Sequence, residues 1–197
     1  VTVDVPGDGH RPRDLVNGFE APGEFGNFSG QVDYDQPMGE LLAGLIDAAL
    51  TWADIDRIRT WSDLPLIIKG ILTPADARLA VDHGAAGVWV SNHGGRQLDR
   101  AIASLDSLGP IVDVVGDRAE VYLDSGVRDG VDVVTALALG ARAVFLGRPF
   151  LYALAVGGEA GLSAAADGLR LETTKAMALL GTTRVGELDR THVVGGI

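Results

Sequence analysis

The residues Ser91-Asn92-His93-Gly94-Gly95-Arg96-Gln97-Leu98-Asp99 follow directly on the apolar run Gly87-Val88-Trp89-Val90. Such a run is typical of a short strand that is buried on both faces. Its carboxyl end delivers a histidine, two glycines and an arginine together. These residue types offer a proton acceptor, a flexible turn and a clamp for an anion. The pattern predicts a functional site at the end of this strand rather than another part of the core.

The same order of strand, turn and helix repeats around this stretch. The other apolar runs are predicted as strands, and each ends in polar or glycine residues: Leu66-Ile67-Ile68 before Lys69-Gly70, Val121-Tyr122-Leu123 before Asp124-Ser125-Gly126, and Ala143-Val144-Phe145-Leu146 before Gly147-Arg148. Helices are predicted between the strands, over roughly 101–115 with an interruption at Gly109-Pro110, and over Val131–Leu139.

Steady alternation of strands and helices predicts an α/β fold with a parallel sheet. An open doubly wound sheet and a (β/α)8 TIM barrel both satisfy this pattern. Polar residues at the carboxyl side of every strand favour the barrel, because barrel enzymes place their sites there. The sequence also lacks the GxGxxG element of a dinucleotide-binding fold. We therefore predict part of a (β/α)8 barrel.

Composition narrows the choice of compartment and partner. The chain has 197 residues, of which 47% are hydrophobic, a formal net charge of -11 and no cysteine. This length predicts a single domain over residues 1–197. The negative charge argues against nucleic-acid and membrane partners and favours small molecules. The lack of cysteine excludes disulfides and, with no signal-like segment, favours a cytoplasmic location.

The first forty residues differ from the rest of the chain. The sequence opens on Val1 without a methionine, within what reads as the end of a strand, so we expect a fragment of a longer protein. Residues 11–40 contain proline, glycine, asparagine and aspartate without a sustained period. They are predicted to form a long, lid-like loop with at most one short helix.

Three groups of residues could carry chemistry by their types alone. His93 suits a structural hydrogen-bonding role as well as a general base, but Arg96 lies three residues on and can grip a carboxylate with two parallel bonds. Lys69, one of two lysines, either extends to solvent or stabilises developing negative charge. The glycine turns at 124–130 and 147–148 together predict a phosphate site, because glycines let backbone N–H groups approach an anion.

The stretch SNHGGRQLD closely resembles the signature of the FMN-dependent L-2-hydroxy acid oxidases and dehydrogenases. The resemblance implies FMN as cofactor, a small lactate- or glycolate-like acid as substrate, and oxygen, a quinone or another electron acceptor. It implies that His93 is the catalytic base, oriented by Asp4, and that Arg96 and Arg11 bind the substrate carboxylate, with Arg13 as the alternative to Arg11. The residues that it implies at the cofactor are Thr2, Lys69, Ser91, Asp124, Ser125, Gly126, Arg128, Gly147 and Arg148.

Two residues of the predicted phosphate turn depart from the family pattern. The family has LDGGVRRG where residues 123–130 of this chain read LDSGVRDG. We expect Ser125 to crowd the backbone approach to a phosphate. We expect Asp129 to weaken the local positive potential.

The resemblance covers the barrel from the end of the fourth strand to the eighth strand. It continues through tail helices predicted over Gly158–Leu180 and Arg184–Arg190. It implies that the first three strands are missing from this sequence. We further expect the protein to form a homo-oligomer.

Two other interpretations stay open. A truncated, non-catalytic half-barrel that binds flavin or phosphate would need a partner for apolar strand edges at Val1 and Val144. Another FMN barrel is the second alternative. An isomerase of the isopentenyl diphosphate type is disfavoured by the arginine of the HGGR stretch, and the chemistry of an inosine monophosphate dehydrogenase relative is excluded because the chain has no cysteine.

Overall fold

The computed structural model describes residues 1–7, 9–19, 44 and 46–193. Its centre is a parallel sheet of four strands in the order β1-β2-β3-β4. The strands are β1 (Ile67–Ile71), β2 (Gly87–Val90), β3 (Glu120–Leu123) and β4 (Ala143–Val144). The helices are α1 (Pro12–Asn17), α3 (Trp52–Arg59), α4 (Pro74–Asp82), α5 (Ser104–Val115), α6 (Gly130–Ala138) and α7 (Arg148–Leu179).

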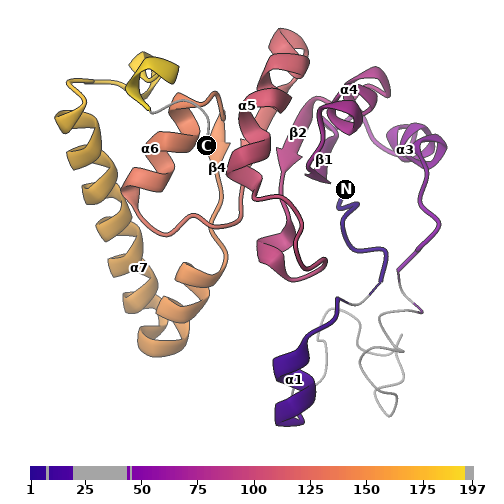
Figure 1. Ribbon diagram of the computed structural model, residues 1–197, viewed down its shortest axis with the longest axis horizontal. Coiled ribbons are helices and arrows are strands. Elements are labelled where there is room, and N and C mark those ends of the chain that lie inside the picture. Colours follow the sequence, from indigo (N-terminus) through magenta and orange to yellow (C-terminus); the bar gives the residue numbers. More distant parts are fainter. Residues whose placement is uncertain (8, 20–43, 45, 194–197) are drawn as a thin grey trace.

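The strand order follows the chain, as in a barrel and unlike a doubly wound sheet, whose order reverses at a switch point. Figure 1 shows α3, α4, α5, α6 and α7 succeeding one another from one side of the fold to the other. A further parallel segment borders β1, because Val3 N donates to Lys69 O at 2.8 Å and Lys69 N donates to Val1 O at 2.8 Å. The segment at residues 1–3 and the four strands together form the predicted part of a (β/α)8 barrel.

The core lies between the sheet and the helices. Ile68, Val88 and Val121 are neighbours in one row across the sheet, and all three are buried. Helix α5 adds Leu108 and Ile111, both 0% exposed. Each such side chain contributes roughly 1.5–3 kcal/mol by leaving water. This packing fixes the strands and so fixes the positions of their carboxyl ends.

The predicted interruption at Gly109-Pro110 is wrong. Helix α5 runs through both residues without a break. A proline within a helix removes one backbone hydrogen bond. Here the face formed by Leu108, Ile111 and Val115 is buried, and tertiary packing of such a face outweighs local preference.

The tail also differs from the prediction. Helix α7 begins at Arg148 and includes the predicted 158–180 segment except its last residue, with non-helical φ and ψ angles at Gly158. Residues 184–190 do not form the predicted helix. This part of the tail contains two short 3₁₀ segments instead, Val185–Glu187 and Arg190–His192. The carboxylate of Glu187 accepts from Thr183 N at 2.7 Å and from Arg184 N at 3.2 Å. Such local side-chain bonds compete with helix formation.

Helix α1 is the short helix allowed for in the predicted lid-like loop, and most of that loop, residues 20–40, lies outside the described residues. Helix α3 begins where Thr51 N donates to the Asp54 carboxylate at 2.8 Å. Among the residues that the structure describes, no helix combines the length and the apolar character needed to cross a membrane.

Candidate active site

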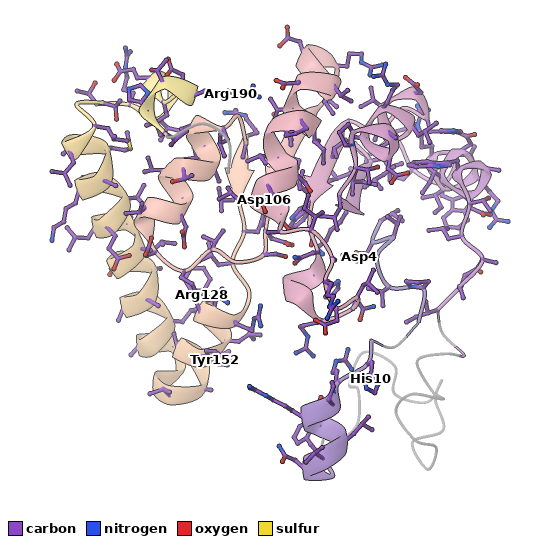
Figure 2. The ribbon with its side chains drawn as sticks, viewed as in Figure 1. Asp4, His10, Asp106, Arg128, Tyr152 and Arg190 are labelled. Atoms are coloured by element: carbon purple, nitrogen blue, oxygen red, sulfur yellow. The ribbon has the colours of Figure 1, made fainter. Side chains whose placement is uncertain are left out.

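One row of side chains crosses the sheet on the face opposite the helix-packed core. Thr2, Lys69, Trp89 and Tyr122 are successive neighbours in register. Side chains of adjacent residues in a strand point to opposite faces, so this row faces away from Ile68 and its neighbours. Figure 2 shows Asp4 toward the carboxyl ends of the strands, with His10 beyond it.

Lys69 lies within strand β1 rather than at its end. The strand continues to Ile71, and its register with β2 shifts between Lys69 and Ile71. The extra residue, Gly70, forms a bulge of the kind that often re-aims a neighbouring side chain. The predicted strand end at Lys69-Gly70 was therefore too early by one residue.

The Lys69 ammonium is surrounded by polar groups from three other segments. Its Nζ donates to Ser91 Oγ at 2.8 Å, and it lies 3.6 Å from Asp4 Oδ2 and 3.5 Å from Asp124 Oδ2. The side chains of Lys69, Asp4 and Asp124 are only 18%, 12% and 17% exposed. One cation faces two carboxylates, so the cluster has an excess of negative charge.

His93 completes this cluster on the side of Asp4. Its Nδ1 lies 3.1 Å from Asp4 Oδ1, and its backbone N donates to Ser91 Oγ at 3.0 Å. The His93 side chain is 36% exposed, so a small molecule can reach the ring. A carboxylate at Nδ1 orients the imidazole and stabilises positive charge on it. The geometry suits a proton acceptor at Nε2.

Asp4 reaches His93 because Gly70 has no side chain. A Cβ on Gly70 would lie 2.6 Å from Asp4 Cβ and 2.9 Å from Asp4 N. The φ of Gly70 is also +109°, in the region that favours glycine. The bulge and the close approach of Asp4 therefore both require glycine at this position.

We expect Gly70→Ala to lower the free energy of unfolding by about 1–3 kcal/mol and to displace Asp4 from His93, because it combines backbone strain with a collision. Urea unfolding measures the first effect. Gly181→Ala is the matched control: its φ is +75°, but a Cβ there meets nothing within 4 Å. Equal losses in the two variants would show that the approach of Asp4 is not the constraint.

Arg96 and Arg11, which are predicted to bind a carboxylate, lie on neighbouring segments rather than in the Lys69 cluster. Arg96 is exposed, and its guanidinium forms no ion pair with any residue that the structure describes. Gly9 lies against the backbone of Arg96 and Gln97, and Gln97 Nε2 donates to Gly7 O at 3.1 Å. Arg11 follows two residues later, at the start of α1. The segment that carries Arg11 thus packs beside Arg96, while Arg13 is exposed on α1.

Ser125, Gly126 and Arg148, which are among the predicted phosphate residues, line a second part of the site. A cavity of about 300 Å³ is lined by Gly94, Ser125, Gly126 and Arg148, among others. Arg148 Nη2 donates to Gly94 O at 2.7 Å. A Cβ at Gly126 or at Gly147 would meet nothing within 4 Å, so the backbone is accessible there.

The start of α6 contributes less to this cavity than expected. Asp129 accepts hydrogen bonds from Val131 N at 2.9 Å and Asp132 N at 3.1 Å, and Gly130 N donates to Glu172 Oε2 at 3.1 Å. The N–H groups that an anion would use are therefore occupied. Arg128 is exposed, and its Nη1 donates to Val127 O at 2.9 Å. Figure 2 shows Arg128 between α6 and α7, away from Asp4.

An aromatic group on the inner face of the sheet was not predicted from the sequence. The rings of Trp89 and Phe145 are 4.0 Å apart, and Tyr122 meets both edge-on. The Lys69 ammonium lies 5.8 Å from the Trp89 ring centre. The Tyr122 hydroxyl donates to Glu120, which raises the pKa of Tyr122 above its ordinary value. The register of the strands, rather than any motif, brings these rings together.

An imidazole–carboxylate pair, an ammonium and a cavity lined by glycines and an arginine lie at the carboxyl ends of the parallel strands, where barrel enzymes place their sites. The comparison with known proteins is more specific. The chain matches the FMN-dependent dehydrogenase family over residues 1–195, and it belongs to that family. The predicted family and its cofactor, FMN, are thereby confirmed.

Named relatives support the same assignment. The chain is 44% identical to glycolate oxidase 3 of Arabidopsis thaliana over 201 residues, which cover 98% of this chain and 55% of the relative. It is 44% identical to L-lactate oxidase of a Nostoc species over 209 residues, covering 96% of this chain and 54% of the relative. A crystal structure of mandelate oxidase with (S)-2-phenylpropionate matches 96% of this chain and 52% of its own, with a TM-score of 0.81 and 43% identity.

The chain therefore spans about half the length of the curated relatives that it matches. The partial barrel of the prediction agrees with this coverage and with the fold of the structural relatives. The residues present fit FMN. The accessible backbone at Gly126 and Gly147 beside Arg148 suits its phosphate, and the Lys69 ammonium on the inner face suits an electron-rich ring.

Proposed function

We propose that this chain provides the proton-accepting and anion-binding residues for FMN-dependent oxidation of a small L-2-hydroxy acid to the 2-oxo acid. The observation that carries the proposal is the contact of His93 Nδ1 with Asp4 Oδ1 at 3.1 Å, beside the Lys69 ammonium. The relatives named glycolate oxidase, L-lactate oxidase and mandelate oxidase support this class of substrate.

The chemistry removes two electrons and two protons from the substrate, one hydrogen from C2 and one from its hydroxyl. His93 accepts one of these protons at Nε2, and Asp4 stabilises the imidazolium that results. FMN, when bound, would supply the acceptor for the two electrons and the other proton. Arg96 and Arg11 hold the substrate carboxylate, which fixes C2 relative to the imidazole. Oxygen is the electron acceptor that the names of the relatives favour.

Each part of the described site has a place in FMN binding. Gly126, Gly147 and Arg148 hold the phosphate through backbone N–H groups and the guanidinium, and Arg128 adds positive charge nearby. Lys69 stabilises negative charge that develops on the ring system. Ser91, Asp124 and Ser125 lie between these two parts, and Thr2 lies beside Lys69 on its other side.

An absorbance experiment tests the proposal on the chain itself. We expect added FMN to bind, with a shifted flavin band, and the band to bleach when L-lactate or glycolate is added without oxygen. Readmitted oxygen should restore the band. A chain that does not bind FMN at all would contradict the proposal.

A second candidate is a non-catalytic half-barrel that binds flavin or phosphate and needs a partner. It is favoured by the sheet edge at β4, which pairs only with β3 among the described strands, and by exposed apolar side chains on α7 such as Leu151 and Val156, 61% and 90% exposed. Exposed edges and apolar faces promote association. This candidate predicts a flavin band that never bleaches and, in light scattering, a dimer of the chain.

A further inference from the structure

The turn that carries His93 has an unusual backbone. His93, Gly94 and Gly95 have φ angles of 56°, 68° and 70°, all in the left-handed region. Glycine enters this region freely, but a residue with a side chain is strained there. Such a conformation persists only where surrounding contacts impose it. The contacts that hold this turn therefore decide where the imidazole lies.

Bonds from within the turn account for only part of this restraint. His93 N donates to Ser91 Oγ at 3.0 Å, and Gly95 N donates to Asn92 Oδ1 at 3.0 Å. The peptide units on either side of Gly94 are held from other strand ends. Gly94 N donates to Ser125 Oγ at 2.8 Å, while Gly94 O accepts from Arg148 Nη2 at 2.7 Å.

Ser125 connects this turn to the charged cluster. Its own φ is 74°, and its hydroxyl donates to Asp124 Oδ1 at 2.6 Å. Asp124 Oδ2 lies 3.5 Å from Lys69 Nζ. Lys69 in turn faces Asp4, which contacts the His93 ring. These interactions form a closed ring. It runs from the His93 imidazole through Asp4, Lys69, Asp124 and Ser125 to the Gly94 amide, which follows His93 in the backbone.

We propose that Ser125 is a positioning residue for His93. Its hydroxyl accepts the Gly94 N–H and donates to Asp124, so it fixes the strained turn against the Lys69 cluster and directs Nδ1 of the imidazole toward Asp4. The inference rests on the proposed function for the role of His93 as a base.

Two substitutions distinguish the effect of the Ser125 hydroxyl from the effect of its strained backbone. Ser125→Gly adopts a φ of 74° without strain but loses both hydrogen bonds of the hydroxyl. Ser125→Ala loses the same bonds and keeps the strain. A role of the hydroxyl therefore predicts similar changes in both variants. A role of the strained backbone alone predicts a change only in the glycine variant, because alanine keeps the strain of the serine.

Two NMR measurements on the chain without FMN or substrate test the proposal. Hydrogen exchange of the Gly94 amide should accelerate about tenfold in both variants, the effect of losing one hydrogen bond. In ¹⁵N spectra of the neutral imidazole, His93 should change from mainly the Nδ1–H tautomer to a mixture. A merely structural role of Ser125 would not alter this tautomer.

Ser104→Ala is the matched control. Asn92 N donates to Ser104 Oγ at 3.0 Å, so this variant removes another amide-to-hydroxyl bond next to the same turn. It should accelerate exchange at Asn92 and leave the His93 tautomer unchanged. Unaltered Gly94 exchange in both Ser125 variants, or an equal tautomer change in Ser104→Ala, would overturn the proposal. Neither measurement depends on turnover. A failure of the proposed function, which flavin bleaching tests, can therefore be distinguished from a failure of this inference.

Discussion

Replacement of Lys69 by methionine is expected to lower the free energy of unfolding by about 3–5 kcal/mol. Methionine preserves much of the apolar stem but removes the ammonium that lies 3.6 Å from Asp4 and 3.5 Å from Asp124. Both carboxylates are mostly buried, and they would be left near each other without a cation. The loss measures the cost of two uncompensated charges rather than the value of one contact.

Two further variants make the Lys69 prediction specific. Lys69→Met combined with Asp124→Asn removes one of the stranded charges and should recover a substantial part of the lost stability. Lys175→Met removes the other lysine of the chain, which is exposed on α7, and should change stability by less than about 0.5 kcal/mol. Urea unfolding of the four proteins supplies the comparison. If Lys69→Met is no less stable than Lys175→Met, the ammonium does not balance the two carboxylates.

The fold could be predicted from the sequence because its strands are short apolar runs that end in polar or glycine residues. Val88 and Val121 are buried on the core side of the sheet, as such runs indicate. The helix through Pro110 could not be predicted from local preference. Its continuity depends on the burial of Leu108 and Ile111 against the sheet, and that contact exists only in the assembled fold.

The candidate site is harder to predict from residue types. Asp4 and His93 are 89 residues apart in the chain and meet only because β1 lies between their segments, with Gly70 allowing the approach. The family resemblance paired them, whereas spacing alone could not. The link between Ser125 and Gly94 escaped prediction because it depends on a left-handed φ at a serine.

Electrostatic expectations also depended on contacts that the sequence does not reveal. Asp129 was expected to weaken the potential at the phosphate turn, but its carboxylate accepts the N–H groups of Val131 and Asp132 in the first turn of α6. The negative charge of Asp129 and the positive end of the α6 dipole therefore offset each other. Arg148 and the open backbone at Gly126 line the cavity, and we propose that they, with Gly147, are the main groups that bind an anion.

His93→Gln is expected to slow the anaerobic bleaching of bound flavin by a 2-hydroxy acid by about 10²–10⁴-fold, the usual contribution of a general base. Glutamine fills a similar volume and can hydrogen-bond to Asp4, but its amide does not accept a proton near neutral pH. FMN affinity should change little, because Arg148 and the glycine turns lie on another part of the site. Stopped-flow absorbance measures the rate, and titration of the flavin band measures the affinity.

His83→Gln is the control for the loss of a histidine. His83 contacts Asp56 at 2.8 Å and stacks on Trp52, on the helical side of the fold. Its replacement should leave the bleaching rate unchanged, even if stability falls slightly. An unchanged bleaching rate in His93→Gln would contradict the assignment of His93 as the base. Among the described residues, no other imidazole contacts Asp4. A fall in FMN affinity equal to the fall in rate would instead place His93 in cofactor binding.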